Sequence, residues 1–133
     1  MNCLDSSFVI DFLDPDAENH DAADGWMREH SDEPLVVPYI CAFEVLRGAA
    51  RADGEYERVK SFLRSSSVDV ESAGLREAVT AAEFDAELRE GGTPLSARDT
   101  LVASCAKRTG YTLVTRDRNF DFEGVPMEVD FYV

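Results

Sequence analysis

The stretch Asn2-Cys3-Leu4-Asp5-Ser6-Ser7 combines a short apolar run with one carboxylate and two hydroxyls. An amphipathic segment, Phe8 to Leu13, follows at once. This order predicts a strand that ends at Asp5 and a helix that is capped by Ser6 or Ser7. In an open α/β sheet, ligands bind in the crevice at the carboxyl ends of the strands. Asp5 is therefore predicted to lie where chemistry takes place.

Short apolar runs alternate with segments of helical periodicity along the rest of the chain. We expect strands at residues 35–37, 68–70, 111–115 and 127–133, and helices at residues 19–30, 39–52, 55–64, 72–89 and 97–109, with Asp53-Gly54 ending the second of these helices. Helical connections between strands imply parallel, right-handed crossovers. The predicted fold is α/β, a three-layer α/β/α sandwich with a parallel sheet of four or five strands, and residues 1–133 are expected to form one domain.

The apolar faces of two helices can be predicted from their spacing. For residues 39–52 the predicted face is Ile40, Phe43, Leu46, Ala49 and Ala50, and for residues 72–89 it is Leu75, Val79, Ala82, Phe84, Ala86 and Leu88. These residues are expected to pack against the rest of the fold.

The charge of the chain is strongly negative. It has a net charge of −14, with 27 acidic residues and only two lysines among 13 basic residues. Such a surface repels nucleic acid in dilute buffer. However, scattered acids with almost no lysine are typical of proteins kept soluble in concentrated salt, where the Debye length falls to about 3 Å. We therefore hypothesise a halophilic host, and the acidity does not exclude a polyanionic substrate.

Other features of the composition point to the cytoplasm. No stretch approaches the roughly 18 uncharged apolar residues of a spanning helix, and no secretory signal is visible, so no membrane partner is expected. Cys3, Cys41 and Cys105 are widely spaced among apolar neighbours. They are predicted to be reduced, buried thiols rather than zinc ligands, which fits a reducing compartment.

Four carboxylates are predicted to share one edge of the sheet. Asp5 ends the first strand, and Glu44 lies about a turn and a half into the helix after the second strand. Asp99 lies in the first turn of a late helix that Ser96 caps, and Asp117 lies just past the strand of residues 111–115. Carboxylates that lie this close together raise one another's pKa, so the cluster is unfavourable unless a cation lies in it.

The expected cation is Mg²⁺ or Mn²⁺. An all-oxygen donor set suits these ions, whereas zinc is disfavoured because His and Cys partners are absent from the set. Such ions activate water, orient a phosphodiester and stabilise charge on the leaving oxygen. The predicted reaction is phosphodiester hydrolysis in which water attacks in line and the 3′ oxygen leaves, so the products should carry a 5′ phosphate.

Four motifs, taken in order, resemble those of the PIN-domain family. They are Asp5-Ser6-Ser7, Glu44-Val45-Leu46-Arg47-Gly48, Asp99-Thr100-Leu101-Val102-Ala103, and Thr115-Arg116-Asp117 followed by Phe120. More narrowly, the chain resembles the VapC toxins of type II toxin–antitoxin pairs, which are small single PIN domains. Each motif alone is weakly specific, whereas all four together cover essentially the whole chain and are strongly specific.

The resemblance implies a metal-dependent endoribonuclease that acts on single-stranded or structured RNA. In it, Asp5, Glu44 and Asp99 would hold the Mg²⁺ or Mn²⁺ ion directly or through water, and Asp117 would complete the catalytic site. Ser6 and Thr115 resemble small hydroxyl positions that bond to the carboxylates or to metal waters. The resemblance also implies a VapB-like antitoxin whose tail blocks the site, and a homodimer.

Alternatives remain open for these residues. Asp5 and Asp99 could be helix N-terminal acids favoured by the macrodipole, Glu44 a solvated helix residue and Asp117 a turn cap. Four arginines near the acids could contact phosphates or could form ion pairs with acids, namely Arg47, Arg98, Arg116 and Arg118.

Two other function classes are alternatives. A PIN-like module could bind metal or RNA without cutting, although the intact set of four acids argues against it. A phosphatase with Asp5 as its nucleophile would require an Asp at position 7, where Ser stands, and a lysine at a late strand end. Neither Lys60 nor Lys107 is so placed.

Overall fold

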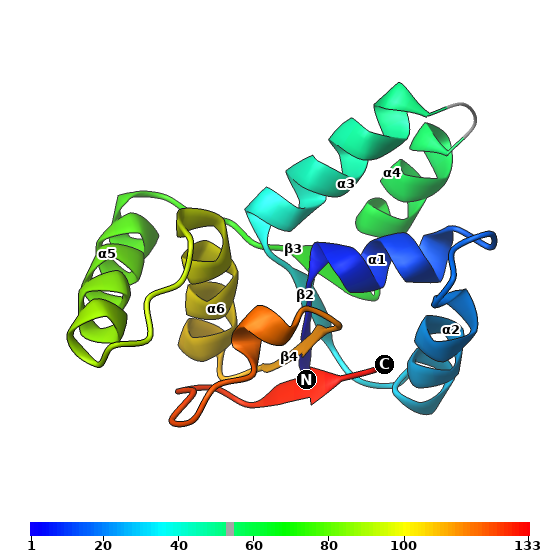
Figure 1. The fold of residues 1–133 in the computed structure, drawn as a ribbon. Coiled ribbons are helices and arrows are strands. Elements are labelled where there is room, and N and C mark those ends of the chain that lie inside the picture. The colour runs from blue at the N-terminus through cyan, green and yellow to red at the C-terminus, as the bar shows by residue number, and fades with distance from the viewer. Residues whose placement is uncertain (53–54) are drawn as a thin grey trace.

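A computed structural model describes residues 1–52 and 55–133 (Figure 1). The strands are β1 (Asn2–Leu4), β2 (Leu35–Val37), β3 (Val68–Val70), β4 (Thr112–Thr115) and β5 (Val129–Phe131). The helices are α1 (Ser6–Leu13), α2 (His20–Glu29), α3 (Tyr39–Arg51), α4 (Tyr56–Arg64), α5 (Leu75–Glu90) and α6 (Ala97–Thr109), with a short 3₁₀ helix η1 (Arg118–Phe120). The helix end predicted at Asp53-Gly54 lies outside the described residues.

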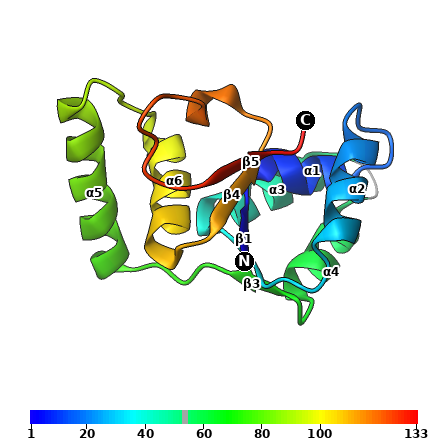
Figure 2. The same ribbon diagram turned by 90° about the horizontal axis from the view of Figure 1, so that it is seen from below.

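The five strands form one parallel sheet in the order β3-β2-β1-β4-β5. Helices α5 and α6 lie on one side of the sheet and α1, α2 and α4 on the other, in both Figure 1 and Figure 2. The predicted three-layer α/β/α sandwich is therefore confirmed. From β1 the chain adds β2 and β3 on one side, then returns to add β4 and β5 on the other. The crevice at the carboxyl ends of β1 and β4 is thus a topological switch point, where α/β folds bind ligands.

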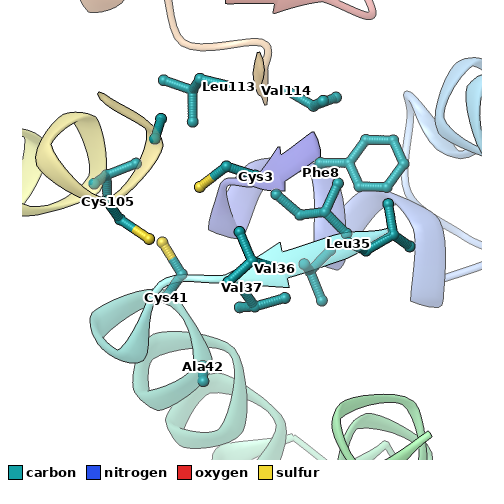
Figure 3. Close-up of a cluster of buried hydrophobic side chains, with 14 of the residues drawn as sticks. Cys3, Phe8, Leu35, Val36, Val37, Cys41, Ala42, Cys105, Leu113 and Val114 are labelled. Atoms are coloured by element: carbon teal, nitrogen blue, oxygen red, sulfur yellow. The ribbon is translucent and has the colours of Figure 1, made fainter. Parts of the chain in front are cut away.

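The core lies between the sheet and its two helical layers. Strands β1, β2 and β4 are buried along almost their whole length, as expected for parallel strands covered on both faces. Figure 3 shows Phe8 of α1 among the buried side chains of β2 and β4, such as Leu35 and Val114. The three cysteines are free and buried, and Figure 3 shows their sulfur atoms gathered in one region, so the prediction of buried thiols is confirmed.

The apolar face predicted for α3 is only partly confirmed. Its buried residues are Cys41, Ala42, Val45 and Ala49, whereas Phe43 is 52% exposed. All four of these side chains are smaller than that of Phe43, so this face allows close packing, and the larger ring is turned outward beneath the Arg47 guanidinium. Of the predicted residues only Ala49 is buried, while Ile40 and Leu46 are partly buried and pack against the core.

The apolar face predicted for α5 is also largely wrong. Leu75 is 81% exposed and Val79 is exposed, whereas Ala81, Phe84 and Leu88 are buried. Figure 1 shows why: α5 is the outermost helix and packs against α6, so a narrow stripe suffices. The helix starts at Leu75, and the backbone N–H of the preceding Gly74 donates to the Glu77 carboxylate.

Among the described helices, none combines the length and hydropathy needed to cross a bilayer.

Candidate active site

Asp5 links the end of β1 to the start of α1. Its carboxylate accepts from the Ser6 backbone N–H at 2.8 Å, which makes Asp5 the helix cap in place of the predicted Ser6 or Ser7. Its second oxygen accepts from the Thr115 hydroxyl at 2.7 Å, because β4 pairs directly with β1. Asp5 is only 1% exposed, so a charge that caps a helix also lies almost fully buried at the switch point.

The guanidinium of Arg98 lies between three of the four acids. Arg98 belongs to the first turn of α6, and its Nη2 lies 2.7 Å from Asp5 Oδ1 and 2.9 Å from Glu44 Oε1. Its Nη1 lies 2.9 Å from Asp99 Oδ1. Partial burial alone would lower the pKa of Arg98, but hydrogen bonds to Glu44 and the charge of Asp5 raise it. A single positive group therefore joins α1, α3 and α6 at this point.

Glu44 is held by two donors rather than left in solvent. The Ser6 hydroxyl donates to its Oε1 at 2.6 Å, and Arg98 Nε donates to both carboxylate oxygens at 3.1 and 3.2 Å. Partial burial opposes ionisation of Glu44, but these hydrogen bonds outweigh it and hold the pKa of the carboxyl below its usual value. The alternative of a solvated helix residue is therefore wrong for Glu44.

Asp99 and Asp117 lie beside this centre in different ways. Asp99 is in the first turn of α6, where its backbone N–H donates to the Ser96 hydroxyl at 3.1 Å, as predicted. Asp117 caps η1 by accepting from the Asn119 backbone N–H at 2.9 Å, so the turn-cap role is real. Both acids line the same open hollow of about 490 Å³ as Asp5 and Glu44. The fold thus brings three acids onto one guanidinium and leaves Asp117 at the rim.

The chemistry of the donor set fits a hard divalent ion. Within residues 1–52 and 55–133, no three His, Cys, Asp or Glu side chains stand close enough to hold an ion as they are. Arg98 lies between the carboxylates and takes the place of a cation there. Carboxylate oxygens are the donors that Mg²⁺ and Mn²⁺ prefer, but here they are spread over the width of a guanidinium. The donor types therefore suit such an ion, and Arg98 stands in the space between them.

Sequence reasoning missed a second buried cluster next to this site. Asp11 is 2% exposed and accepts from Arg116 Nε at 2.8 Å and from the Tyr132 hydroxyl at 2.6 Å. Burial, followed by the hydrogen bond to Asp11, raises the pKa of Tyr132. The available signal was the one acid inside the apolar run Phe8 to Leu13.

The four arginines form internal contacts in the structure. Arg98 pairs with the acids described above, Arg116 with Asp11, and Arg118 with Asp121 at 3.6 Å. Arg47 lies over the Phe43 ring at 5.1 Å. Ion pairing, the alternative to phosphate contact, therefore describes three of them.

Comparisons with known proteins agree with this fold. A family model for the PIN domain matches residues 3–122. FitAcB from Neisseria gonorrhoeae is 19% identical, with a TM-score of 0.76 over 99% of this chain and 98% of that one. DNA-bound VapBC from Salmonella typhimurium is 20% identical, with a TM-score of 0.75 over 99% and 98%. VapC20 from Mycobacterium tuberculosis, a toxin that cleaves the sarcin–ricin loop, is 16% identical, with a TM-score of 0.69 over 85% and 87%. No curated protein matches the chain. At these identities the likeness to the solved structures shows a shared fold.

Proposed function

The chain belongs to the PIN-domain family, and on that premise we propose that it is a metal-dependent endoribonuclease, the toxin of a type II toxin–antitoxin pair. The observation that carries the proposal is the convergence of Asp5, Glu44 and Asp99 on one positive group. Asp117 lines the same hollow. Carboxylates that a fold brings together from distant parts of a chain repel one another, and a cation between them offsets that repulsion.

In this proposal the carboxylates hold Mg²⁺ or Mn²⁺ directly or through water, and Asp117 completes the site. A bound divalent ion supplies an activated water and stabilises negative charge on the leaving oxygen. The hydroxyls of Ser6 and Thr115 donate to Glu44 and Asp5, which fixes the direction in which each carboxylate points. Fixed acceptors favour one ion position over many.

The substrate is proposed to be RNA that enters from the open side of the hollow. Arg116 and Arg118 line that hollow together with the acids. Both side chains are exposed, by 42% and 60%, so each can turn from its acidic partner toward a phosphate. The reaction needs no 2′ hydroxyl as nucleophile, so the products are expected to end in a 5′ phosphate.

Cleavage of a mixed RNA pool tests this function. We expect cleavage with Mn²⁺ in concentrated KCl, and its loss with EDTA or in Asp5→Asn. Asp32→Asn is the matched control, because Asp32 is an exposed acid outside the hollow. Equal loss of activity in Asp5→Asn and in the control Asp32→Asn would contradict the proposal. Products with 2′,3′-cyclic phosphate ends would contradict it as well.

A catalytically silent PIN-like module that binds metal or RNA is the second candidate. The position of Arg98 favours it, because the guanidinium already satisfies the carboxylates without an ion. In that case the wild-type protein would bind Mn²⁺ or RNA, yet no RNA in the pool would be cut. Cleavage that depends on both Mn²⁺ and Asp5 would rule this second candidate out.

Partners and organisation follow as further proposals. The similar structures include a toxin–antitoxin complex from Klebsiella pneumoniae, and by analogy we propose a VapB-like antitoxin for this chain. An apolar hollow of about 280 Å³ next to Glu44 offers room for part of the antitoxin, and it is lined by Ile10, Leu13, Val45, Ala49 and Val59 among others.

We also propose a homodimer in the cytoplasm, with residues 1–133 as one domain around the shared core. Light scattering of the purified chain tests the dimer.

A further inference from the structure

All three nitrogens of the Arg98 guanidinium bond to carboxylates. Nε donates to Glu44, Nη1 donates to Asp99, and Nη2 donates to both Asp5 and Glu44. Arg116 and Arg118, at the rim of the same hollow, each form an ion pair with only one acid. Arg98 is therefore bound to the acidic centre far more completely than its neighbours.

Arg98 and a directly coordinated ion would compete for the same carboxylate oxygens. Asp5 Oδ1 and Glu44 Oε1 accept from the same nitrogen, at 2.7 and 2.9 Å. An ion bound directly to these two oxygens would occupy the space of that nitrogen. The side chain of Arg98 is 26% exposed and lines the open hollow, so it has a path outward. Three carboxylates against one guanidinium also leave two negative charges that attract a divalent ion.

We infer that Arg98 is an internal competitor of the catalytic ion: it holds the acidic centre together in the metal-free protein and must swing out before Mg²⁺ or Mn²⁺ binds. The inference rests on the proposed metal site. The apparent affinity of a site falls in proportion to the fraction of molecules that are ready to bind. Arg98 thus sets the ion concentration at which the site fills, and it keeps the carboxylates in position while the site is empty.

Mn²⁺ affinity, measured by calorimetry, gives the first test. If Arg98 occupies the centre in nine molecules of ten, Arg98→Gln should bind Mn²⁺ at least about tenfold more tightly than wild type. Arg89→Gln is the matched control, because it removes the same charge from an exposed ion pair on α5. Its affinity should equal that of wild type, and Asp5→Asn should bind far more weakly than wild type.

A second measurement uses the wild-type protein, since Arg98→Gln leaves three carboxylates unopposed and can unfold without metal. The Nε–H groups of Arg98 and Arg116 both donate to carboxylates, so both should give slowly exchanging arginine side-chain NMR signals. Titration with diamagnetic Mg²⁺ should shift or remove the Arg98 signal in step with binding. The Arg116 signal should persist as an internal reference.

The outcomes separate this inference from the proposed function. Equal or weaker Mn²⁺ binding by Arg98→Gln, or Mg²⁺ binding that leaves the Arg98 signal unchanged, would overturn the competition while the metal site stands. Absence of binding by wild type and by folded Arg98→Gln at millimolar Mn²⁺ would overturn both. Tighter binding in both arginine variants would also refute it, because bulk charge would then be the cause.

Discussion

Replacement of Asp11 by alanine should destabilise the protein through the cluster that sequence reasoning missed. The change removes an acceptor that is 2% exposed and that holds Tyr132 and Arg116 against α1. The bond from the Tyr132 hydroxyl to a buried charge contributes about 1.5–3 kcal/mol. The Arg116 side chain is 42% exposed, so its ion pair adds under about 1 kcal/mol. The expected loss is about 2–4 kcal/mol, or about 7–14 °C in melting temperature for a chain of this size.

Urea unfolding in EDTA measures this loss, and a double-mutant cycle assigns it. Tyr132→Phe removes only the hydroxyl, because the ring can keep its edge-on packing against Phe8. The coupling between Asp11 and Tyr132 should be at least about 1 kcal/mol. Asp32→Ala, at an exposed loop position, should change the free energy of unfolding by less than about 0.5 kcal/mol. An Asp11→Ala loss no larger than that control, or an additive cycle, would refute the reasoning.

Three further predictions concern pH, thiol reactivity and salt. The pKa of Glu44 is lowered from 4.5, so its stabilising contribution is complete above pH 4.5 and lost as pH falls through the lower folded value. In EDTA, the stability advantage of wild type over Glu44→Gln should shrink in acid, and an advantage that stays constant would contradict this. Burial and then the charge of Asp5 raise the pKa of the Cys41 thiol to about 12, so native Cys41 should resist alkylation by iodoacetamide until urea exposes it. With a net charge of −14, the melting temperature should rise between dilute buffer and about 1 M KCl, and a flat response would count against a halophilic host.

The strands were predictable wherever turn-forming residues stand directly before and after them. β2 and β3 were predicted at residues 35–37 and 68–70, as observed. The last strand was predicted over residues 127–133 but is paired only over Val129–Phe131. It lies at the edge of the sheet, so its length is set by β4, its one neighbour. Side-chain alternation continues beyond that pairing and cannot reveal where the partner ends.

Helix faces were less predictable because the sequence does not say which neighbour a helix meets. Helix α3 carries apolar residues on two sides, and its spacing alone could not choose between Phe43 and Cys41. The choice depends on how closely α3 packs against α1 and α6, which is decided by tertiary structure. The exposed Leu75 of α5 has the same origin, because only a narrow part of that outer helix meets α6.

The acids of the candidate site could be located from the sequence, but their partners could not. Asp5 and Asp117 follow strands, and strand ends meet at one edge of a parallel sheet. Arg98 bonds to an acid 93 positions away, and Tyr132 bonds to one 121 positions away. No local pattern records such pairs, because they exist only after the sheet has brought α1, α6 and the C-terminal segment together. The cation-like role of Arg98 therefore emerged only from the structure.

The most direct test of the central claim is an anomalous difference map from crystals grown with Mn²⁺. We predict a peak between Asp5, Glu44 and Asp99, with the Arg98 side chain turned away from Asp5 Oδ1. Asp117 should lie beside the peak, within reach of a water bound to the ion. A map with no peak at millimolar Mn²⁺, with the guanidinium still between the three carboxylates, would contradict the metal-dependent nuclease and leave the silent module as the better account.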